Sequence, residues 1–335
     1  MSFLKSGAEQ NYSERLLLTK YAPKKLQDFH GNHGVKQTLL SYIESGNLPH
    51  LLIHGPHGCG KSLITKLLVN EYLGARYLKE GCLEIYGSLS RSKDVITENP
   101  NSKSKTKNKQ KNFNCPGITN FMKKSSNLPK HLIKIIVIYE FHQMSDEAQM
   151  ALRRIMELNS NKVRFIFVSE NHSGIIQAIQ SRCTPLQMRK LSDSEIDQLL
   201  INIIASEKID IKPGLLPEFL DLIKINAEGD IRIAVNLLQL LTTYQMSNHE
   251  WYQILGIPEI KYLQKIIQAC IDSQPITAYR MTKLLLDQGF EICDVLDLLS
   301  RVLINFPEFP QKIEYLRILC HDTFTIEECY TEIQL

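Results

Sequence analysis

One short stretch, residues 50–73, limits the fold of this chain more than any other feature. It reads HLLIH, then GPHGCGKS, then LITKLLVNEYL: an apolar run, a glycine-rich turn, and a segment with apolar residues at helical spacing. The turn, residues 55–62, matches the pattern G-x-x-x-x-G-K-[ST]. Between a strand and a helix, this pattern is typical of a loop whose backbone N–H groups surround phosphates. The sequence therefore predicts an α/β nucleotide-binding domain.

Every residue of this phosphate loop is a candidate nucleotide ligand: Gly55, Pro56, His57, Gly58, Cys59, Gly60, Lys61 and Ser62. In loops of this type the lysine reaches the β- and γ-phosphates, and the serine hydroxyl binds Mg²⁺. We therefore expect Lys61 on the phosphates and Ser62 as the metal ligand. The alternative, a chance glycine-rich turn, does not account for the strand and the helix on either side.

Three further apolar runs fit strands of the same sheet, at 82–87, 133–140 and 163–170. The continuous apolar character of the second run suits a parallel sheet covered by helices on both faces. Residues 92–114 are instead rich in Lys, Asn and Ser, with almost no large apolar side chains. Such a segment cannot bury enough surface to fold, so we predict a mobile loop insertion at about 92–127.

After residue 190 the strand patterns stop, and nearly all of the chain to residue 335 has helical periodicity. Ser192 followed by Glu195 predicts a capping-box start for the first of these helices. We predict an α/β nucleotide-binding domain over 1–188, a small helical lid domain over 189–248, and a helical C-terminal domain over 249–335.

The composition excludes several classes of protein. A chain of 335 residues with 43% hydrophobic and 22% charged residues is typical of a multidomain globular protein. The formal net charge of +3 excludes a strongly basic nucleic-acid binder, so nucleic-acid contacts must come from a local patch or from patches pooled by several subunits. We expect no signal peptide and no membrane span. The eight cysteines form no C-x-x-C pair, which argues against a zinc site.

The run 133–140 ends in a single acid, Glu140. After a phosphate loop, such a strand-end acid is typical of a site that polarises an attacking water, and a neighbouring aspartate usually helps to hold Mg²⁺. The residue before it here is Tyr139, which cannot replace a carboxylate. The alternative is a buried strand that merely ends in an acid, but its distance from the phosphate loop favours the catalytic interpretation.

Several motifs in a fixed order carry a family resemblance. They are KYAPKKLQDFHGN (20–32), GPHGCGKS, EFHQMSDEAQMALRRIME (140–157), AIQSRC (178–183) and GDIRIAVNLLQ (229–239). On these motifs the chain resembles the small subunits of the replication factor C clamp loader, a branch of the AAA+ ATPases. The resemblance covers roughly the first 240 residues, and the rest matches in helical character only. It implies an α/β P-loop AAA+ domain (a parallel sheet flanked by helices), then a small helical domain and an all-helical C-terminal collar domain used for oligomerisation.

The resemblance also implies roles in an ATP site. Tyr21 and Pro23 match a segment near the adenine, while Lys61 and Ser62 match the ligands of phosphate and Mg²⁺. Glu140 matches the glutamate that activates water.

The chain departs from the family pattern at three positions of that site. Tyr139 and His142 replace the two aspartates of the acidic box, and Glu170 stands where an asparagine usually senses the γ-phosphate. A carboxylate that faces a phosphate is unhelpful unless a cation or a proton intervenes. These departures predict weak hydrolysis at this chain's own site.

Four arginines match functional positions of the family. Arg182 matches the arginine finger inserted into the neighbouring subunit's ATP site, and Arg232 matches the second sensor of the nucleotide. Arg153 and Arg154 lie in a segment that matches the helix lining the DNA channel, where one of the two is expected to contact DNA or the subunit interface. The alternative for any single arginine is an ordinary surface residue.

The resemblance implies a small subunit of a clamp loader, which uses ATP binding and hydrolysis to load a sliding clamp onto primer–template DNA during DNA replication. Its partners would be other clamp-loader subunits in a hetero-pentamer, the clamp, and DNA held through its backbone. An alternative is a hydrolysis-poor structural subunit that donates Arg182 to its neighbour, and a remote alternative is a P-loop kinase for a small molecule. We expect localisation in the nucleus, or at a viral replication site in the host cell if the gene is viral.

Overall fold

The computed structural model describes residues 16–88, 117–123, 128–129, 132–209, 214–243 and 248–333. Two compact units make up the chain. The first comprises Met1–Ile201 and Gly229–Ile233, and the second comprises Asn202–Glu228 and Ala234–Leu335. The division into three domains, over 1–188, 189–248 and 249–335, remains a prediction from the sequence.

A five-stranded sheet forms the centre of the first unit. Its strands are β1 (Leu51–His54), β2 (Cys82–Tyr86), β3 (Lys134–Tyr139), β4 (Val163–Ser169) and β5 (Thr184–Gln187). They lie in the order β2-β3-β4-β1-β5, and each neighbouring pair is parallel. This confirms the predicted parallel sheet. The sequence did not reveal β5, because TPLQ is too short and too polar to show a strand pattern.

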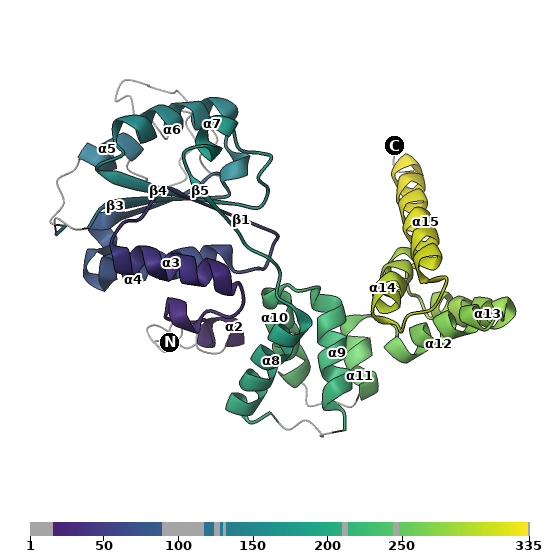
Figure 1. The fold of residues 1–335 in the computed structure, drawn as a ribbon. Helices are drawn as coiled ribbons and strands as arrows, with labels where there is room; N and C mark the ends of the chain where they lie inside the picture. The colour runs from purple at the N-terminus through teal and green to yellow at the C-terminus, as the bar shows by residue number, and fades with distance from the viewer. Residues whose placement is uncertain are drawn as a thin grey trace, which may run out of the picture. The chain divides into compact units, whose positions relative to one another are not determined.

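Helices cover both faces of this sheet (Figure 1). One face carries α3 (His33–Ser45) and α4 (Lys61–Gly81), with the short α2 (Leu17–Lys20) beyond them; the other carries α5 (Ile118–Lys123), α6 (Asp146–Leu158) and α7 (Gln177–Gln180). Short 3₁₀ turns lie at Leu26–Asp28 (η1) and Phe141–Gln143 (η3).

Helix α5 corrects the predicted loop insertion at its C-terminal end. The insertion was expected to run to about residue 127, but Ile118–Lys123 is helical. Its Ile118 and Phe121 are buried against the sheet, and these two apolar groups anchor a helix that the polar composition of the preceding residues had obscured. Residues 92–114 lie outside the described part of the chain.

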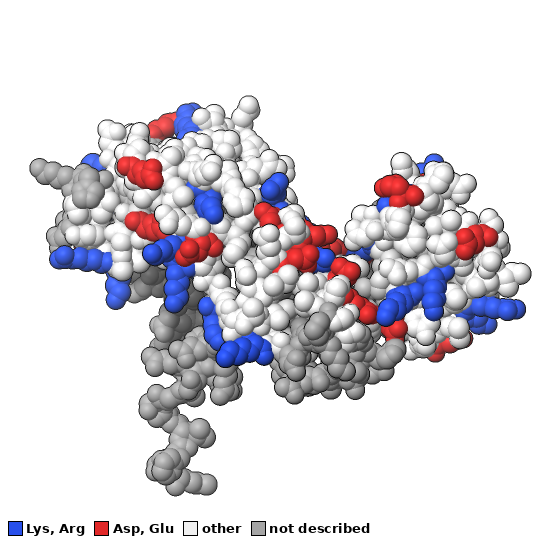
Figure 2. All heavy atoms as spheres, turned by 60° about the horizontal axis from the view of Figure 1, so that its bottom comes forward, with Lys and Arg blue, Asp and Glu red and all other residues white. Residues whose placement is uncertain are grey.

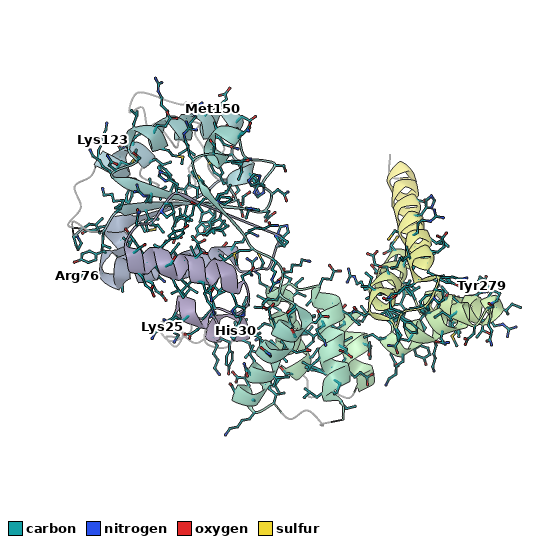
Figure 3. All side chains as sticks on the ribbon, viewed as in Figure 1. Lys25, His30, Arg76, Lys123, Met150 and Tyr279 are labelled. Carbon is teal, nitrogen blue, oxygen red and sulfur yellow. The ribbon has the colours of Figure 1, made fainter. Side chains whose placement is uncertain are left out.

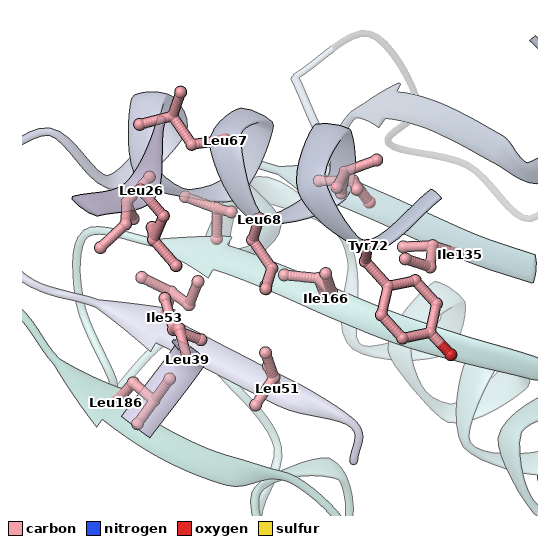
Figure 4. Close-up of a cluster of buried hydrophobic side chains, with 14 of the residues drawn as sticks. Leu26, Leu39, Leu51, Ile53, Leu67, Leu68, Tyr72, Ile135, Ile166 and Leu186 are labelled. Carbon is pink, nitrogen blue, oxygen red and sulfur yellow. The ribbon is translucent and has the colours of Figure 1, made fainter. Parts of the chain in front are cut away.

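Strand β3 separates the two cores of this unit. All six of its residues are buried. Ile135 and Val137 belong to the core under α4, which includes Leu68 (Figure 4), whereas Ile136 and Ile138 belong to the core under α6. Burial of each such side chain contributes about 1.5–3 kcal/mol. A strand with two covered faces has no polar alternation, which explains its continuous β-branched sequence.

Apart from the connections between helices, the described residues of the second unit are helical. The helices after the sheet are α8 (Asp193–Glu207), α9 (Leu216–Ala227), α10 (Ile231–Thr243), α11 (Asn248–Leu255), α12 (Ile260–Ile271), α13 (Pro275–Asp287), α14 (Ile292–Asn305) and α15 (Lys312–Ile333). A core of buried side chains from α12, α13 and α14 includes Leu263, Leu285 and Leu299. Among the described residues, no helix combines the length and the apolar character that crossing a membrane requires.

The capping box that begins α8 is confirmed. The Ser192 backbone N–H donates to Glu195 Oε2 at 2.9 Å, and the Glu195 backbone N–H donates to Ser192 Oγ at 3.4 Å. The hydrogen bond from the Ser192 backbone is the main reason that the pKa of Glu195 is lowered. Two backbone donors that the helix leaves free at its start are thereby satisfied, as the sequence pattern predicts.

His50 makes the stability of the first unit depend on pH. Its Nδ1 accepts the backbone N–H of Phe165 at 3.0 Å, which requires the neutral imidazole. Burial, together with the charge of Arg164, lowers the pKa of His50 from 6.5 to about 4. Between these two values the unfolded chain binds the proton and the folded chain does not, so the stability falls as pH falls.

We therefore expect the free energy of unfolding to decrease by about 1–2 kcal/mol between pH 7 and pH 4, a range that allows for the partial exposure of this ring. Urea unfolding of the wild type and of His50→Gln at several pH values measures this. The difference between the two proteins should depend on pH, whereas His30→Gln, at an exposed position (Figure 3), should follow the wild type. A pH-independent difference for His50→Gln would contradict the assignment.

Candidate functional site

The phosphate loop connects β1 to α4, as predicted. Gly58 has φ of +68°, and a Cβ there would lie 1.9 Å from Cγ of Asp230, so a side chain at this position is excluded by both backbone and space. Lys61 is the first residue of α4 and is buried, and its Nζ donates to the carbonyls of Gly55 at 2.8 Å and Pro56 at 2.6 Å. The lysine ammonium is therefore held inside the curve of the loop.

A cavity of about 120 Å³ opens beside this loop. Residues from the loop, from the carboxyl ends of β2, β3 and β4, and from the start of α10 line it: His57, Gly58, Gly60, Lys61, Ser62, Tyr86, Tyr139, Glu140, Val168, Ser169, Glu170 and Arg232. All of them belong to the first unit. In open parallel sheets, ligands bind at this edge because the strands end there together.

This cavity gathers most of the predicted nucleotide-site residues but not all of them. Lys61, Ser62, Glu140, Glu170 and Arg232 lie around one space, although Lys61 and Arg232 are 171 positions apart in the sequence. Gly55, Pro56 and Cys59 complete the phosphate loop without lining the cavity. Tyr21 and Pro23 follow α2 and lie outside the lining as well.

Tyr139 occupies the strand-end position where a carboxylate was expected. Its side chain is 3% exposed, and its ring stacks on that of Tyr86 with the centroids 5.2 Å apart. Within the described residues the buried hydroxyl has no hydrogen-bond partner. Burial raises the pKa of Tyr139, and the nearby charge of Glu84 adds to this effect, so the phenol stays neutral. Tyr139 therefore brings no negative charge to the cavity.

Glu140 follows directly, at a sharp turn of the backbone. Its φ of 52° and ψ of 42° lie in the left-handed region, which few residues other than glycine adopt. A Cβ on Gly87 would lie only 2.4 Å from the carbonyl oxygen of Glu140, so the two turns fit closely against each other. Strained residues of this kind occur often at functional sites.

Glu170 lies between two imidazoles. Its Oε2 is 3.0 Å from Nε2 of His57, in the phosphate loop, and 4.0 Å from Nε2 of His142. The other nitrogen of His142, Nδ1, is 3.3 Å from Oγ of Ser169. A carboxylate beside phosphates needs a nearby cation or proton. Protonation of either imidazole would supply one and offset the charge of the carboxylate.

The residues of the cavity fit a magnesium-bound triphosphate. The lysine ammonium and the serine hydroxyl of the loop line the same cavity. In phosphate loops, the ammonium serves the phosphates and the hydroxyl serves the metal. Ser62 would hold Mg²⁺, and the carboxylates that could support it indirectly are Glu140 and Glu170.

The remaining predicted arginines lie away from this cavity. Arg182 lies between α7 and β5, and its Nη2 donates to Glu157 Oε1 of α6 at 2.6 Å. Arg153, also on α6, donates from Nε to the same oxygen at 3.2 Å, while Arg154 is exposed. The structure thus brings together Arg182 and Arg153 around one carboxylate that the sequence analysis did not single out.

Tyr86, Val168, Ser169 and Asp230 belong to the site but were not assigned from the sequence. Tyr86 is the last residue of β2 and pairs in register with Tyr139, the last residue of β3. The position of a residue at the end of a predicted parallel strand is the signal that identifies the first three. Asp230 is part of the motif GDIRIAVNLLQ, but its proximity to Gly58 depends on the folded chain.

Comparison with proteins of known sequence identifies relatives over most of the chain. The probable replication factor C subunit 2 of Dictyostelium discoideum is 34% identical over 303 residues, which is 89% of this chain and 82% of that protein. Replication factor C subunit 2 of Arabidopsis thaliana is 32% identical with the same coverage, and the replication factor C small subunit of the archaeon Picrophilus torridus is 32% identical over 92% of this chain and 91% of that protein. These relatives come from cellular organisms, so they lend no support to a viral origin.

Two broader comparisons agree with this relationship. A family model described as DNA polymerase III, delta subunit, matches residues 31–192. The solved structure of the Thermotoga maritima RuvB Holliday junction branch migration motor has a TM-score of 0.52 and 16% identity, and the match covers 85% of this chain and 90% of that one. At this identity the second match shows the fold alone, and it confirms the predicted AAA+ architecture. With its phosphate loop, its strand-end glutamate and relatives above 30% identity over most of its length, the chain belongs to the replication factor C small subunits, the clamp-loader family of AAA+ ATPases that acts in DNA replication.

Proposed function

We propose that this chain binds ATP with Mg²⁺ in the cavity beside the phosphate loop and works as one of several unlike subunits of a hetero-pentameric clamp loader. The assembly places a sliding clamp onto primer–template DNA in the nucleus. The observation that carries the proposal is the meeting of the phosphate loop, Glu140 and Arg232 around one cavity in a chain of this family. The eukaryotic relatives support the nuclear location.

Four residues of the cavity have distinct parts in this proposal. The ammonium of Lys61 offsets the charge of the β- and γ-phosphates, and the hydroxyl of Ser62 holds Mg²⁺, which neutralises charge on the same phosphates. The carboxylate of Glu140 orients and polarises the attacking water. Arg232, at the first turn of α10, contacts the nucleotide as the second sensor.

Hydrolysis at this chain's own site is slow in the proposed mechanism. In the family's acidic box, Tyr139 stands in place of one aspartate and is a buried neutral phenol. His142 stands in place of the second aspartate. Glu170 adds negative charge at the place of a γ-phosphate sensor, where it is paired with His57. These features also favour the second candidate function, a subunit that binds nucleotide, hydrolyses it poorly, and donates Arg182 to its neighbour.

DNA contact is proposed to come from the backbone phosphates and from several subunits together. Among the described residues, positive and negative side chains are interspersed on the face shown in Figure 2. Arg154 of α6 is exposed and free to reach a phosphate, which adds affinity but no sequence preference.

Co-purification of the tagged chain should recover the other clamp-loader subunits, and a chain that elutes alone would contradict the assembly.

Glu140→Gln in this subunit alone tests whether hydrolysis at this chain's own site is slow. The amide keeps the shape of the side chain but cannot polarise water as a carboxylate does. We expect the ATP turnover of the reconstituted assembly to fall by less than about twofold, because a slow site is lost among several faster ones. Turnover near zero would show that this site is a main catalytic site and would reject the slow-site proposal. Glu147→Gln, an exposed glutamate on α6, is the control for expression and assembly.

A further inference from the structure

A shared carboxylate joins two of the arginines that the family resemblance singles out. Glu157 Oε1 accepts from Arg182 Nη2 at 2.6 Å and from Arg153 Nε at 3.2 Å. Arg153 lies one helical turn before Glu157 on α6, whereas Arg182 comes from the segment between α7 and β5. The contact therefore ties the candidate finger to a different element of the fold.

The guanidinium of Arg182 makes three hydrogen bonds. Besides the contact of Nη2 with Glu157, its Nη1 donates to the carbonyl of Ala178 at 2.6 Å and to Ser181 Oγ at 3.4 Å. A guanidinium has five N–H donors in one plane, so these contacts fix that plane and leave other donors for a phosphate. A long arginine side chain without them has many rotamers, and ordering it costs free energy at the moment of reaction.

The second arginine keeps the cluster positively charged. A single carboxylate beside Arg182 would cancel the charge that a finger must bring to the phosphoryl group. Here Arg153 shares the carboxylate, so two guanidinium groups and one carboxylate leave a net charge of +1. The hydrogen bond from Arg153, together with the charge of Arg182, lowers the pKa of Glu157, which keeps it ionised in the neutral range.

We propose that Glu157 is the positioning residue of the arginine finger: it orients the Arg182 guanidinium toward the neighbouring subunit, and Arg153 offsets its charge. This inference rests on the proposed role of Arg182 in trans. It also gives Arg153 and Arg154, adjacent in the sequence, different tasks. Arg153 supports the finger from within the subunit, and Arg154 is left for partners outside it.

The test is a mutant cycle in the reconstituted assembly, with every other nucleotide site disabled so that turnover reports the site that faces Arg182. Glu157→Ala should lower kcat at that site about tenfold with the KM for ATP nearly unchanged, because a reacting group displaced by about 1 Å can cost up to ~100-fold. In the Arg182→Ala background, Glu157→Ala should have no further effect. Glu157→Gln, which keeps an acceptor oxygen without the charge, should fall between Glu157→Ala and the wild type.

A control comes from another helical ion pair, whose carboxylate is exposed. Asp221 and Lys224 of α9 are 2.9 Å apart, and Asp221→Asn should leave kcat unchanged. If Arg182→Ala lowers kcat but Glu157→Ala does not, or if Glu157→Ala lowers it equally in the Arg182→Ala background, the positioning role is wrong and the finger remains. If Arg182→Ala itself has no effect, the finger in trans is wrong, which is a separate failure of the proposed function.

Discussion

Lys61→Ala is expected to weaken ATP binding by this chain by about 100-fold or more, because it removes the charged ammonium donor. Hydrogen bonds of charged groups each contribute roughly 1.5–3 kcal/mol in a protein, and Coulomb attraction to the phosphates adds to this. Its Nζ is already directed into the phosphate loop, where it donates to the carbonyls of Gly55 and Pro56. A buried ammonium in this position requires little rearrangement to meet a phosphate. Titration of the full-length chain with a fluorescent ATP analogue, with and without Mg²⁺, measures the loss.

The matched control is Lys66→Ala, five residues later on the exposed side of α4. It removes the same charge from the same helix but lies outside the cavity, so its affinity for ATP should equal that of the wild type. Thermal unfolding of both variants separates a binding defect from a folding defect, since the loop carbonyls lose their donor in Lys61→Ala. An unchanged affinity in a folded Lys61→Ala protein would contradict the placement of the triphosphate in this loop.

The sequence predicts the elements that lie nearest to the nucleotide because each has a local pattern. The strand before the phosphate loop and the helix after it have different apolar periods, and the glycines between them have no other good explanation. Strand β3 was found for the same reason, since both of its faces are buried and its sequence is continuously apolar. The elements that were missed lack such a pattern. Strand β5 has four residues with one buried side chain, and α5 has six residues after a long polar stretch.

Contacts between distant segments were the part of the site that the sequence did not predict. The sequence identified Glu170 as an acid in an unfavourable place, but its pairing with His57, more than a hundred residues away, depends on the folded edge of the sheet. Glu157 was passed over for a similar reason. It looks like an ordinary solvent-exposed residue of an amphipathic helix, and its contact with Arg182 arises only when α7 lies against α6. Periodicity identifies which face of a helix is buried, but not which exposed side chains meet.

Arg182→Ala should lower hydrolysis at the neighbouring subunit by ~10³–10⁵, the range measured for arginine fingers of GTPases, because the transferring phosphoryl group then loses the positive charge supplied in trans. The side chain is 34% exposed and sits outside the cavity of its own subunit. ATP affinity at this chain's own site should therefore be unchanged. Pre-steady-state hydrolysis in the reconstituted assembly measures the first effect, and nucleotide titration measures the second.

Arg189→Ala is the matched control for this prediction. Arg189 lies just after β5, as Arg182 lies just before it, and its side chain is 73% exposed and 4.0 Å from Glu195. Removing it takes away the same charge at the other end of β5, at a position with no proposed role in trans, so hydrolysis should stay at the wild-type rate. A similar loss in both variants would indicate a general electrostatic effect, and no loss in Arg182→Ala would place the finger elsewhere. A selective loss in Arg182→Ala, with full assembly and unchanged binding by its own subunit, means that the chain acts on ATP held by its neighbour even where its own hydrolysis is slow.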